Sequence, residues 1–277
     1  MLILVTTDGS SRSLDVLPHA ARLAEVAGAE LLLLRVLDPD HDDASAEASA
    51  QTLRALAATV PVAASVLVEP RAGRERVGDA ILRVAARRRA RLIAMASRGT
   101  GLVRRALLGS VATDVLGKTP LPLMVTGDQV HPPKATLPYH ALVTSDGSPA
   151  AEVVLDPLKR VFADTAPGRL RLTLLRVYAA ALGDPPRDVA IEKCERDLAA
   201  FRRHAPRRFP VDQAVREVVQ LGGVAATILA AAGEAGADAI WMATQGYSFS
   251  HQVLLGSVAL EALGRSELPI VLTRAPR

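Results

Sequence analysis

Short apolar runs alternate with amphipathic stretches along the whole chain. The run Leu2–Thr6 predicts a strand buried on both faces, because its apolar residues follow one another without the alternation of a half-exposed strand. Residues 74–89 instead carry apolar residues at helical spacing. These residues are Val77, Ile81, Leu82, Val84 and Ala85. Strands that alternate with helices indicate an α/β fold, an open parallel sheet with helices on both faces.

The same order of elements is predicted twice. The expected strands are 2–6, 31–36, 62–68, 91–96 and 123–126, then 141–145, 170–177, 211–219, 239–243 and 269–273. The expected helices are 10–27, 44–58, 74–89 and 110–116, then 148–163, 186–204, 223–236 and 257–265. Ser10 or Ser11 is expected to cap the first helix and Gly28 to end it. In helix 186–204, Ile191, Leu198 and Phe201 are core candidates.

Residues 128–140 separate the two series. This stretch holds His131-Pro132-Pro133 and Pro138 and has no hydrophobic periodicity, as expected of a linker. We therefore expect a first domain over 1–127, a linker over 128–140 and a second domain over 141–277, each domain with about five strands.

A glycine-bearing motif also occurs twice, each time after a predicted strand. The first copy is Ala96-Ser97-Arg98-Gly99, nine residues, then Gly109-Ser110, and the second is Ala243-Thr244-Gln245-Gly246, nine residues, then Gly256-Ser257. Glycine lets a backbone approach a ligand closely, and the amides and dipole of a helix N-terminus attract anions. The motif therefore predicts a phosphate site in each half.

Composition narrows the class of protein. Aromatic residues are only 3% of the chain, so the cores must be aliphatic, and the apolar runs are far too short to cross a bilayer. Cys194 is the one cysteine, which excludes an intrachain disulfide, and the N-terminus looks like a strand rather than a signal peptide. A cytoplasmic protein is expected.

The net charge of +4 comes mainly from arginines, clustered at 87–89, 202–203 and 207–208. Solvated helix ends explain these clusters better than a nucleic-acid surface does, because acidic residues are interspersed and no aromatic platform accompanies them. The sequence contains no Gly-x-Ser-x-Gly elbow, no Gly-x4-Gly-Lys-[Ser/Thr] loop and no paired histidine spacing. A serine hydrolase, a P-loop NTPase and a histidine metal centre are not indicated.

The two halves match at four further places. Thr6-Thr7-Asp8-Gly9-Ser10 matches Thr144-Ser145-Asp146-Gly147-Ser148, and Leu33-Leu34-Arg35-Val36 matches Leu174-Leu175-Arg176-Val177. Leu107–Ala112 matches Leu254–Ala259, and Leu121-Pro122-Leu123 matches Leu268-Pro269-Ile270. This set resembles the universal stress protein family in its tandem two-domain form, over almost the whole chain outside the linker. The resemblance implies two Rossmann-like domains of the adenine nucleotide alpha hydrolase kind.

The resemblance also implies a site in each half for ATP or another adenine nucleotide, with Mg²⁺ where the nucleotide brings it. Asp8 and Asp146 would lie near the adenine and ribose, and Val36 and Val177 would present backbone groups to the adenine edge. The amides that would cradle phosphates are those of Gly99, Gly109, Ser110 and Val111, and of Gly246, Gly256, Ser257 and Val258. The serine hydroxyls can donate to phosphate oxygens.

This chain departs from the family motif at its first glycine, which is Ala96 in one half and Ala243 in the other. The methyl group narrows the space near the phosphates and restricts φ, and is tolerated if φ is negative. The two loops also differ. Arg98, Arg104 and Arg105 in the first loop are Gln245, His251 and Gln252 in the second, which also carries Tyr247 and Phe249. We expect the first site to bind nucleotide more tightly.

Three functions are compatible with these residues. The first is a nucleotide-binding stress-response regulator without fast turnover. The second is a slow ATPase or phosphotransferase, in which Arg98 would neutralise charge. The third is an interaction module without nucleotide, in which Asp8 and Asp146 only cap helices and the Gly-Ser pairs only start them. By resemblance, the fifth strands of the two domains are expected to pair within the chain, and two chains can associate further as a homodimer.

Overall fold

The computed structural model of the chain describes residues 1–97, 108–180, 184–218, 223–244 and 255–274. Its strands form one ten-stranded sheet in the order β3-β2-β1-β4-β5-β10-β9-β6-β7-β8. The first five are β1 (Leu2–Thr6), β2 (Glu30–Leu37), β3 (Ala64–Pro70), β4 (Leu92–Ala96) and β5 (Leu123–Thr126). The others are β6 (Tyr139–Thr144), β7 (Leu170–Tyr178), β8 (Val211–Glu217), β9 (Ala239–Ala243) and β10 (Ile270–Thr273). The predicted α/β class is confirmed. We call residues 1–127 the first repeat and 139–274 the second.

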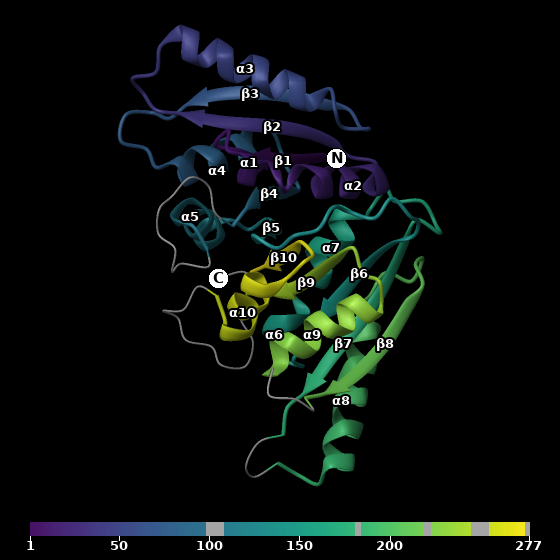
Figure 1. Ribbon diagram of the computed structural model, residues 1–277. Coiled ribbons are helices and arrows are strands. Elements are labelled where there is room, and N and C mark those ends of the chain that lie inside the picture. The colour runs from purple at the N-terminus through teal and green to yellow at the C-terminus, as the bar shows by residue number, and fades with distance from the viewer. Residues whose placement is uncertain (98–107, 181–183, 219–222, 245–254, 275–277) are drawn as a thin grey trace.

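Each repeat is parallel throughout, and the two repeats meet along an antiparallel ladder (Figure 1). In this ladder Met124 lies opposite Val271, with Leu123 opposite Leu272 and Val125 opposite Ile270. All the residues of β5 and β10 are buried. Two strand edges that would otherwise be exposed are thereby paired.

Helices cover both faces of the sheet. One face packs against α2 (Leu17–Ala27), α3 (Asp43–Ala57), α7 (Leu155–Val161) and α8 (Arg187–Arg202). The other packs against α4 (Val77–Arg87), α5 (Ser110–Lys118), α9 (Gly223–Glu234) and α10 (Ser257–Arg265). Each of the two cores draws residues from both repeats, so the repeats share their hydrophobic interior.

The cores are largely aliphatic, as the composition predicts. The exceptions on the first face include Tyr139, Phe162 and Trp241, whose rings stack in tilted contacts with centroids 5.8 to 5.9 Å apart. Leu198 and Phe201 are buried as expected, whereas Ile191 is only half-buried.

Two expected helices are wrong, because each is split in two. Residues 10–27 form α1 (Ser11–Leu14) and α2, and residues 148–163 form α6 (Pro149–Glu152) and α7. Pro18 and Pro157 stand within the first three residues of α2 and α7. Proline has no N–H to bond the carbonyl four residues earlier, so it is accommodated only where a helix starts afresh.

Most other boundaries shift by one to three residues at an end. The largest change at the expected linker is that β6 begins at Tyr139, inside 128–140. The preceding residues are held by both repeats. Arg22 of α2 donates to the carbonyl of Thr136, and the His131 amide donates to the carbonyl of Glu267.

Because both cores cross the ladder, the chain is expected to unfold in one transition. Met124→Ala removes a fully buried side chain at the ladder and should lower the free energy of unfolding by about 2–4 kcal/mol. The melting temperature should fall by roughly 5–10 °C, still with a single transition in calorimetry. Two transitions, only one of them shifted by the substitution, would contradict a shared interior.

Candidate functional site

The motif loops are closed at their base by the same hydrogen bond in both repeats. The amide of Gly109 donates to the carbonyl of Ser97 over 2.6 Å, and that of Gly256 donates to Thr244 over 2.7 Å. The amides of Ser97 and Thr244 in turn donate to the last residues of β5 and β10, each over 2.8 Å. Each loop therefore begins and ends at one point beyond the carboxyl end of the sheet. Arg98, Gly99 and Gly246 fall in the loops, outside the described residues.

Glycine caps the helix that follows each loop. Gly109 and Gly256 are the N-cap residues of α5 and α10, and no side chain accepts a hydrogen bond there. By contrast, the Ser10 hydroxyl accepts from the Ser13 amide at the start of α1. The first amides of a helix have no partner within it, so a cap without a side chain leaves them to an anion or to water. Both glycines have φ near −65°, which any residue adopts. Glycine matters here because it has no side chain, and not because its backbone is free to adopt unusual conformations.

The aspartates do not cap the helices after β1 and β6. Ser10 and Ser148 are the caps. Asp8 Oδ1 accepts from the amide and hydroxyl of Ser10, and Asp146 Oδ1 accepts from the Ser148 amide over 2.9 Å. Reading these aspartates as helix caps was therefore wrong. Each one closes a tight turn that fixes its carboxylate at the carboxyl end of the sheet.

An arginine underlies each of these turns, and the sequence analysis missed it. Gly9 and Gly147 have φ of 86° and 78°, and a Cβ on either would collide with the guanidinium of Arg35 or Arg176. Arg176 Nε and Nη1 are buried without a hydrogen-bond partner in the described part of the chain, and Nη2 lies 3.5 Å from Asp197. The only sequence signal was the arginine shared by the two Leu-Leu-Arg-Val segments.

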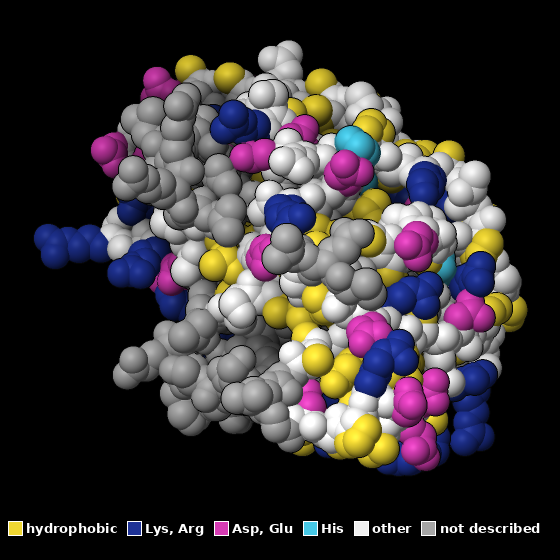
Figure 2. Space-filling view, turned by 60° about the horizontal axis from the view of Figure 1, so that its bottom comes forward, with side chains coloured by type: hydrophobic (Ala, Val, Ile, Leu, Met, Phe, Trp, Pro, Cys, Tyr) yellow, Lys and Arg dark blue, Asp and Glu magenta, His cyan; other side chains and the backbone are white. Residues whose placement is uncertain are grey.

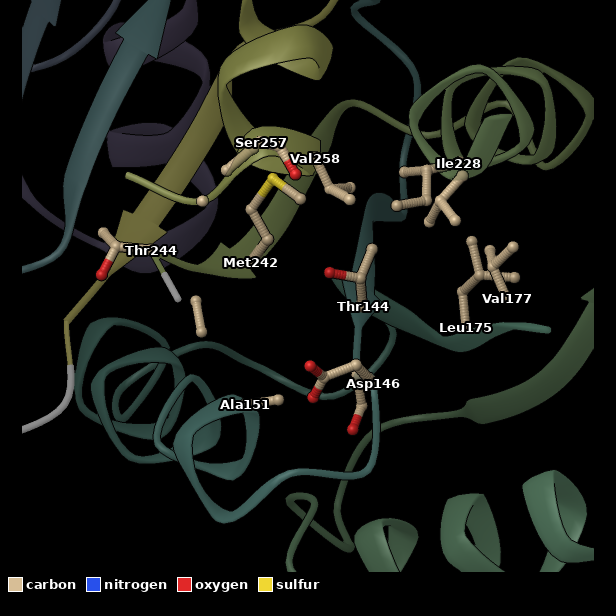
Figure 3. A pocket seen from close by; sticks show the side chains of 15 residues that line it. Thr144, Asp146, Ala151, Leu175, Val177, Ile228, Met242, Thr244, Ser257 and Val258 are labelled. Atoms are coloured by element: carbon tan, nitrogen blue, oxygen red, sulfur yellow. The ribbon is translucent and has the colours of Figure 1, made fainter. Parts of the chain in front are cut away.

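In the second repeat these elements surround a cavity of about 140 Å³ (Figure 3). The predicted site residues that line it are Asp146, Val177, Ala243, Gly256, Ser257 and Val258. Leu175, Val177 and Ile228 gather on one side, Ser257 lies near Met242, and Thr244 lies on the side away from the apolar group. The Asp146 carboxylate stands between Thr144 and Ala151. One wall of the cavity is thus apolar and the opposite side carries hydroxyls and helix amides.

Several lining residues were not predicted. Thr144, Ser145, Met242 and Thr244 belong to the matched segments and could have been named from them. Val224 and Ile228 come from α9, and only the fold brings them to the cavity.

The first repeat carries the counterparts at the same places. Asp8 follows β1, Val36 is the seventh residue of β2, Ala96 ends β4, and α5 begins at Ser110 and Val111. Parallel pairing of β2, β1 and β4 brings these positions to one edge of the sheet. Ser110 and Ser257 are both exposed.

The alanines that replace the first motif glycine do not strain the backbone. Within the described ranges, Arg89 is the only residue other than glycine with a positive φ, so Ala96 and Ala243 have negative φ. Their methyl groups can affect only the space near a ligand.

The described residues contain no group of three His, Cys, Asp or Glu side chains arranged to hold a metal ion. No helix in the described ranges is long and apolar enough to cross a membrane. On the face shown in Figure 2, basic and acidic side chains are interspersed rather than gathered by sign.

Comparison with known proteins agrees with this architecture. The family model described as the universal stress protein family matches residues 1–127 and 139–274. The chain belongs to the universal stress protein family. The resemblance inferred from the motifs is confirmed, and membership supports a role in the stress response.

Solved structures show the same fold. A universal stress protein from Archaeoglobus fulgidus DSM 4304 is 21% identical, with a TM-score of 0.66 over 99% of this chain and 96% of its own. A protein from Pseudomonas aeruginosa UCBPP-PA14 is 16% identical, with a TM-score of 0.62 over 98% of this chain and 92% of its own. No curated protein matches the sequence.

An ion network fixes the segment between β3 and α4 in the first repeat of this universal stress protein. Arg83 donates to both Glu69 and Glu75, and Arg87 also pairs with Glu69. The hydrogen bond from Arg83, followed by that from the Ala72 amide, lowers the pKa of Glu75 to about 2. The network ends next to Val77, the counterpart of the cavity residue Val224.

Because the pKa of Glu75 is lowered in the folded state, its stabilising effect is complete above pH 4.5 and is lost as the pH falls toward 2. Glu75→Gln should lower the melting temperature at pH 7 by about 2 °C, in keeping with an ion pair open to solvent. The difference in urea unfolding midpoint between the variant and the unsubstituted protein should shrink as the pH is lowered from 7 to 5 to 3.5. Glu47→Gln, which breaks an exposed pair with Arg54, is the control and should change little. A gap that stays constant down to pH 3.5 would contradict this account.

Proposed function

We propose that this universal stress protein binds ATP or another adenine nucleotide at the carboxyl ends of its strands, and acts as a regulator rather than as a fast enzyme. The observation that carries the proposal is the second-repeat cavity. A glycine-capped helix and the Ser257 hydroxyl face it from one side, and an apolar wall with a fixed carboxylate faces them. An adenine nucleotide combines a flat aromatic base with a phosphate tail, which matches these two sides of the cavity.

The described residues fit a nucleotide part by part. The wall of Leu175, Val177 and Ile228 offers an apolar surface to the base, and Asp146 can accept from ribose or base donors. The amides of Ser257 and Val258 at the start of α10 would hold phosphate oxygens. The site offers Asp146 as its carboxylate, so Mg²⁺ would be held largely by the phosphates.

The two sites are proposed to differ in strength. Arginines at 98, 104 and 105 put more positive charge into the first loop than Gln245, His251 and Gln252 put into the second. Two sites of different affinity would fill over a wider range of nucleotide concentration than one. Their occupancy would set a conformation that a partner protein recognises.

We also propose that 1–127 and 141–277 are two universal stress protein domains, which pair within one chain through β5 and β10 and share one interior. The ladder between those strands supports this organisation. The cytoplasmic location and a further homodimer remain predictions from the sequence.

Calorimetric titration of ATP with Mg²⁺ into nucleotide-free protein tests the proposal. Gly256→Glu places a carboxylate at the start of α10 and should weaken the second site at least tenfold, since it repels the phosphates. Gly109→Glu should do the same at the first site and remove the tighter class of binding. Gly233→Glu on the exposed side of α9, where a side chain meets nothing within 4 Å, is the matched control and should leave both sites intact.

The outcome with unsubstituted protein decides between functions. At a thousandfold excess over the dissociation constant, nucleotide should stabilise the fold by about 4 kcal/mol. Absence of heat together with an unchanged melting temperature at millimolar ATP would contradict the proposal and favour an interaction module.

A further inference from the structure

A second polar hollow lies at the opposite end of the first repeat. Its volume is about 480 Å³, and it lies beside the first residues of β1 and β2, whereas Asp8 follows the other end of β1. Arg88, Arg89 and Arg91 line it, together with the Ser65 hydroxyl and one carboxylate, Glu30. The hollow lies at the end of α4 and takes no part in the nucleotide site proposed above.

The arginines of this hollow differ from their neighbours in lacking acidic partners. Arg83, more than one turn earlier, and Arg87, directly before Arg88, are both paired with Glu69. Within the described ranges, Arg88 and Arg89 make no side-chain ion pair or hydrogen bond, and Glu30 lies beyond ion-pair distance of them. Arg91 donates to the carbonyl of Arg160 over 3.2 Å, its one side-chain hydrogen bond to a described residue. The lining thus carries a net positive charge, since Arg88, Arg89 and Arg91 face a single carboxylate, Glu30.

Arg89 adopts a backbone conformation that residues other than glycine disfavour. Its φ is 53°, the left-handed region that favours glycine. The corresponding residue of the second repeat is Gly236, with φ of 64°, at the same turn after the equivalent helix. One repeat therefore uses the residue suited to the turn, and the other places an arginine there at a conformational cost.

The fold itself does not require these cations. Residues 87–91 read Arg-Arg-Arg-Ala-Arg, whereas the corresponding residues 234–238 read Glu-Ala-Gly-Ala-Asp. Basic residues at a helix C-terminus favour the helix dipole, but α9 ends with Glu234 in an equivalent structure. A helix at the same place in the fold therefore forms without arginines at the positions of Arg88, Arg89 and Arg91.

A neighbouring hollow extends the basic surface. It has a volume of about 360 Å³, shares Arg91 with the first, and adds Arg160 and Lys159 from α7. Lys159 is partly neutralised by Asp156, 3.0 Å away. An anion that spans both hollows would meet cations over more than the width of one phosphate group.

We propose that this amino-end groove, lined by Arg88, Arg89, Arg91 and Arg160, binds a small ligand that carries two or more phosphate groups. Guanidinium forks match phosphate oxygens in pairs, and no aromatic side chain lines either hollow to stack a nucleic-acid base.

The test is Arg89→Gly, which gives the first repeat the residue of the second. Because glycine suits the turn, the variant should fold with an unchanged melting temperature or one raised by up to about 3 °C. Calorimetric titration with tripolyphosphate should nevertheless show one class of site weakened about tenfold. Binding of phosphate at the starts of α5 and α10 should not change. Those helix starts follow the carboxyl ends of strands, whereas Arg89 lies at the opposite end of the sheet.

Arg203→Ala, an exposed arginine at the end of α8, removes the same net charge and should leave tripolyphosphate binding within twofold. Equal losses in the two variants would mean general charge attraction and would overturn the proposal. So would unchanged binding in Arg89→Gly. Tight binding of a duplex oligonucleotide that Arg89→Gly abolishes, with no tripolyphosphate binding, would overturn the small-ligand class in favour of nucleic acid.

Discussion

Parallel strand pairing is the constraint on which this molecule depends. When β2, β1 and β4 run side by side in the same direction, their carboxyl ends must reach one edge of the sheet, and the loops that leave those ends must meet. Residues separated by a hundred positions, such as Asp8 and Ser110, come to one region for that reason alone. The second repeat obeys the same rule with β7, β6 and β9, and there strand ends and helix starts line a cavity.

The antiparallel ladder between β5 and β10 lets one chain contain two such edges. It joins the repeats through strands that are wholly buried, and both cores continue across it. The sequence differences between the repeats on which the proposed sites depend lie in their loops and ends, where side chains are not needed for the core. The arginine-rich amino end of the first repeat and the Glu-Ala-Gly-Ala-Asp segment of the second illustrate how far such surfaces diverge on one scaffold.

The sequence predicted the fold class, the strand series and the family, because apolar runs and repeated motifs are local signals. It failed where a local signal was overlooked and where the deciding contact is distant in the chain. The breaks before α2 and α7 follow from Pro18 and Pro157, which lie inside the two expected helices, and this local signal was overlooked. Ile228 reaches the cavity only through the packing of α9. The capping role considered for Asp8 was wrong because Ser10, two residues later, is better placed for that bond. Arg176 was missed because nothing local shows that it lies beneath Gly147.

We propose above that the glycine-capped helix starts hold the phosphates of an adenine nucleotide. Amide chemical shifts in ¹⁵N-labelled protein, followed during addition of ATP with Mg²⁺, test it most directly. The account predicts saturable shifts for Gly256, Ser257 and Val258 and their first-repeat counterparts, with no change at Ser13, whose amide is already capped by Ser10. Saturation without movement of the Gly256 and Gly109 regions, or no shifts at all, would contradict the account.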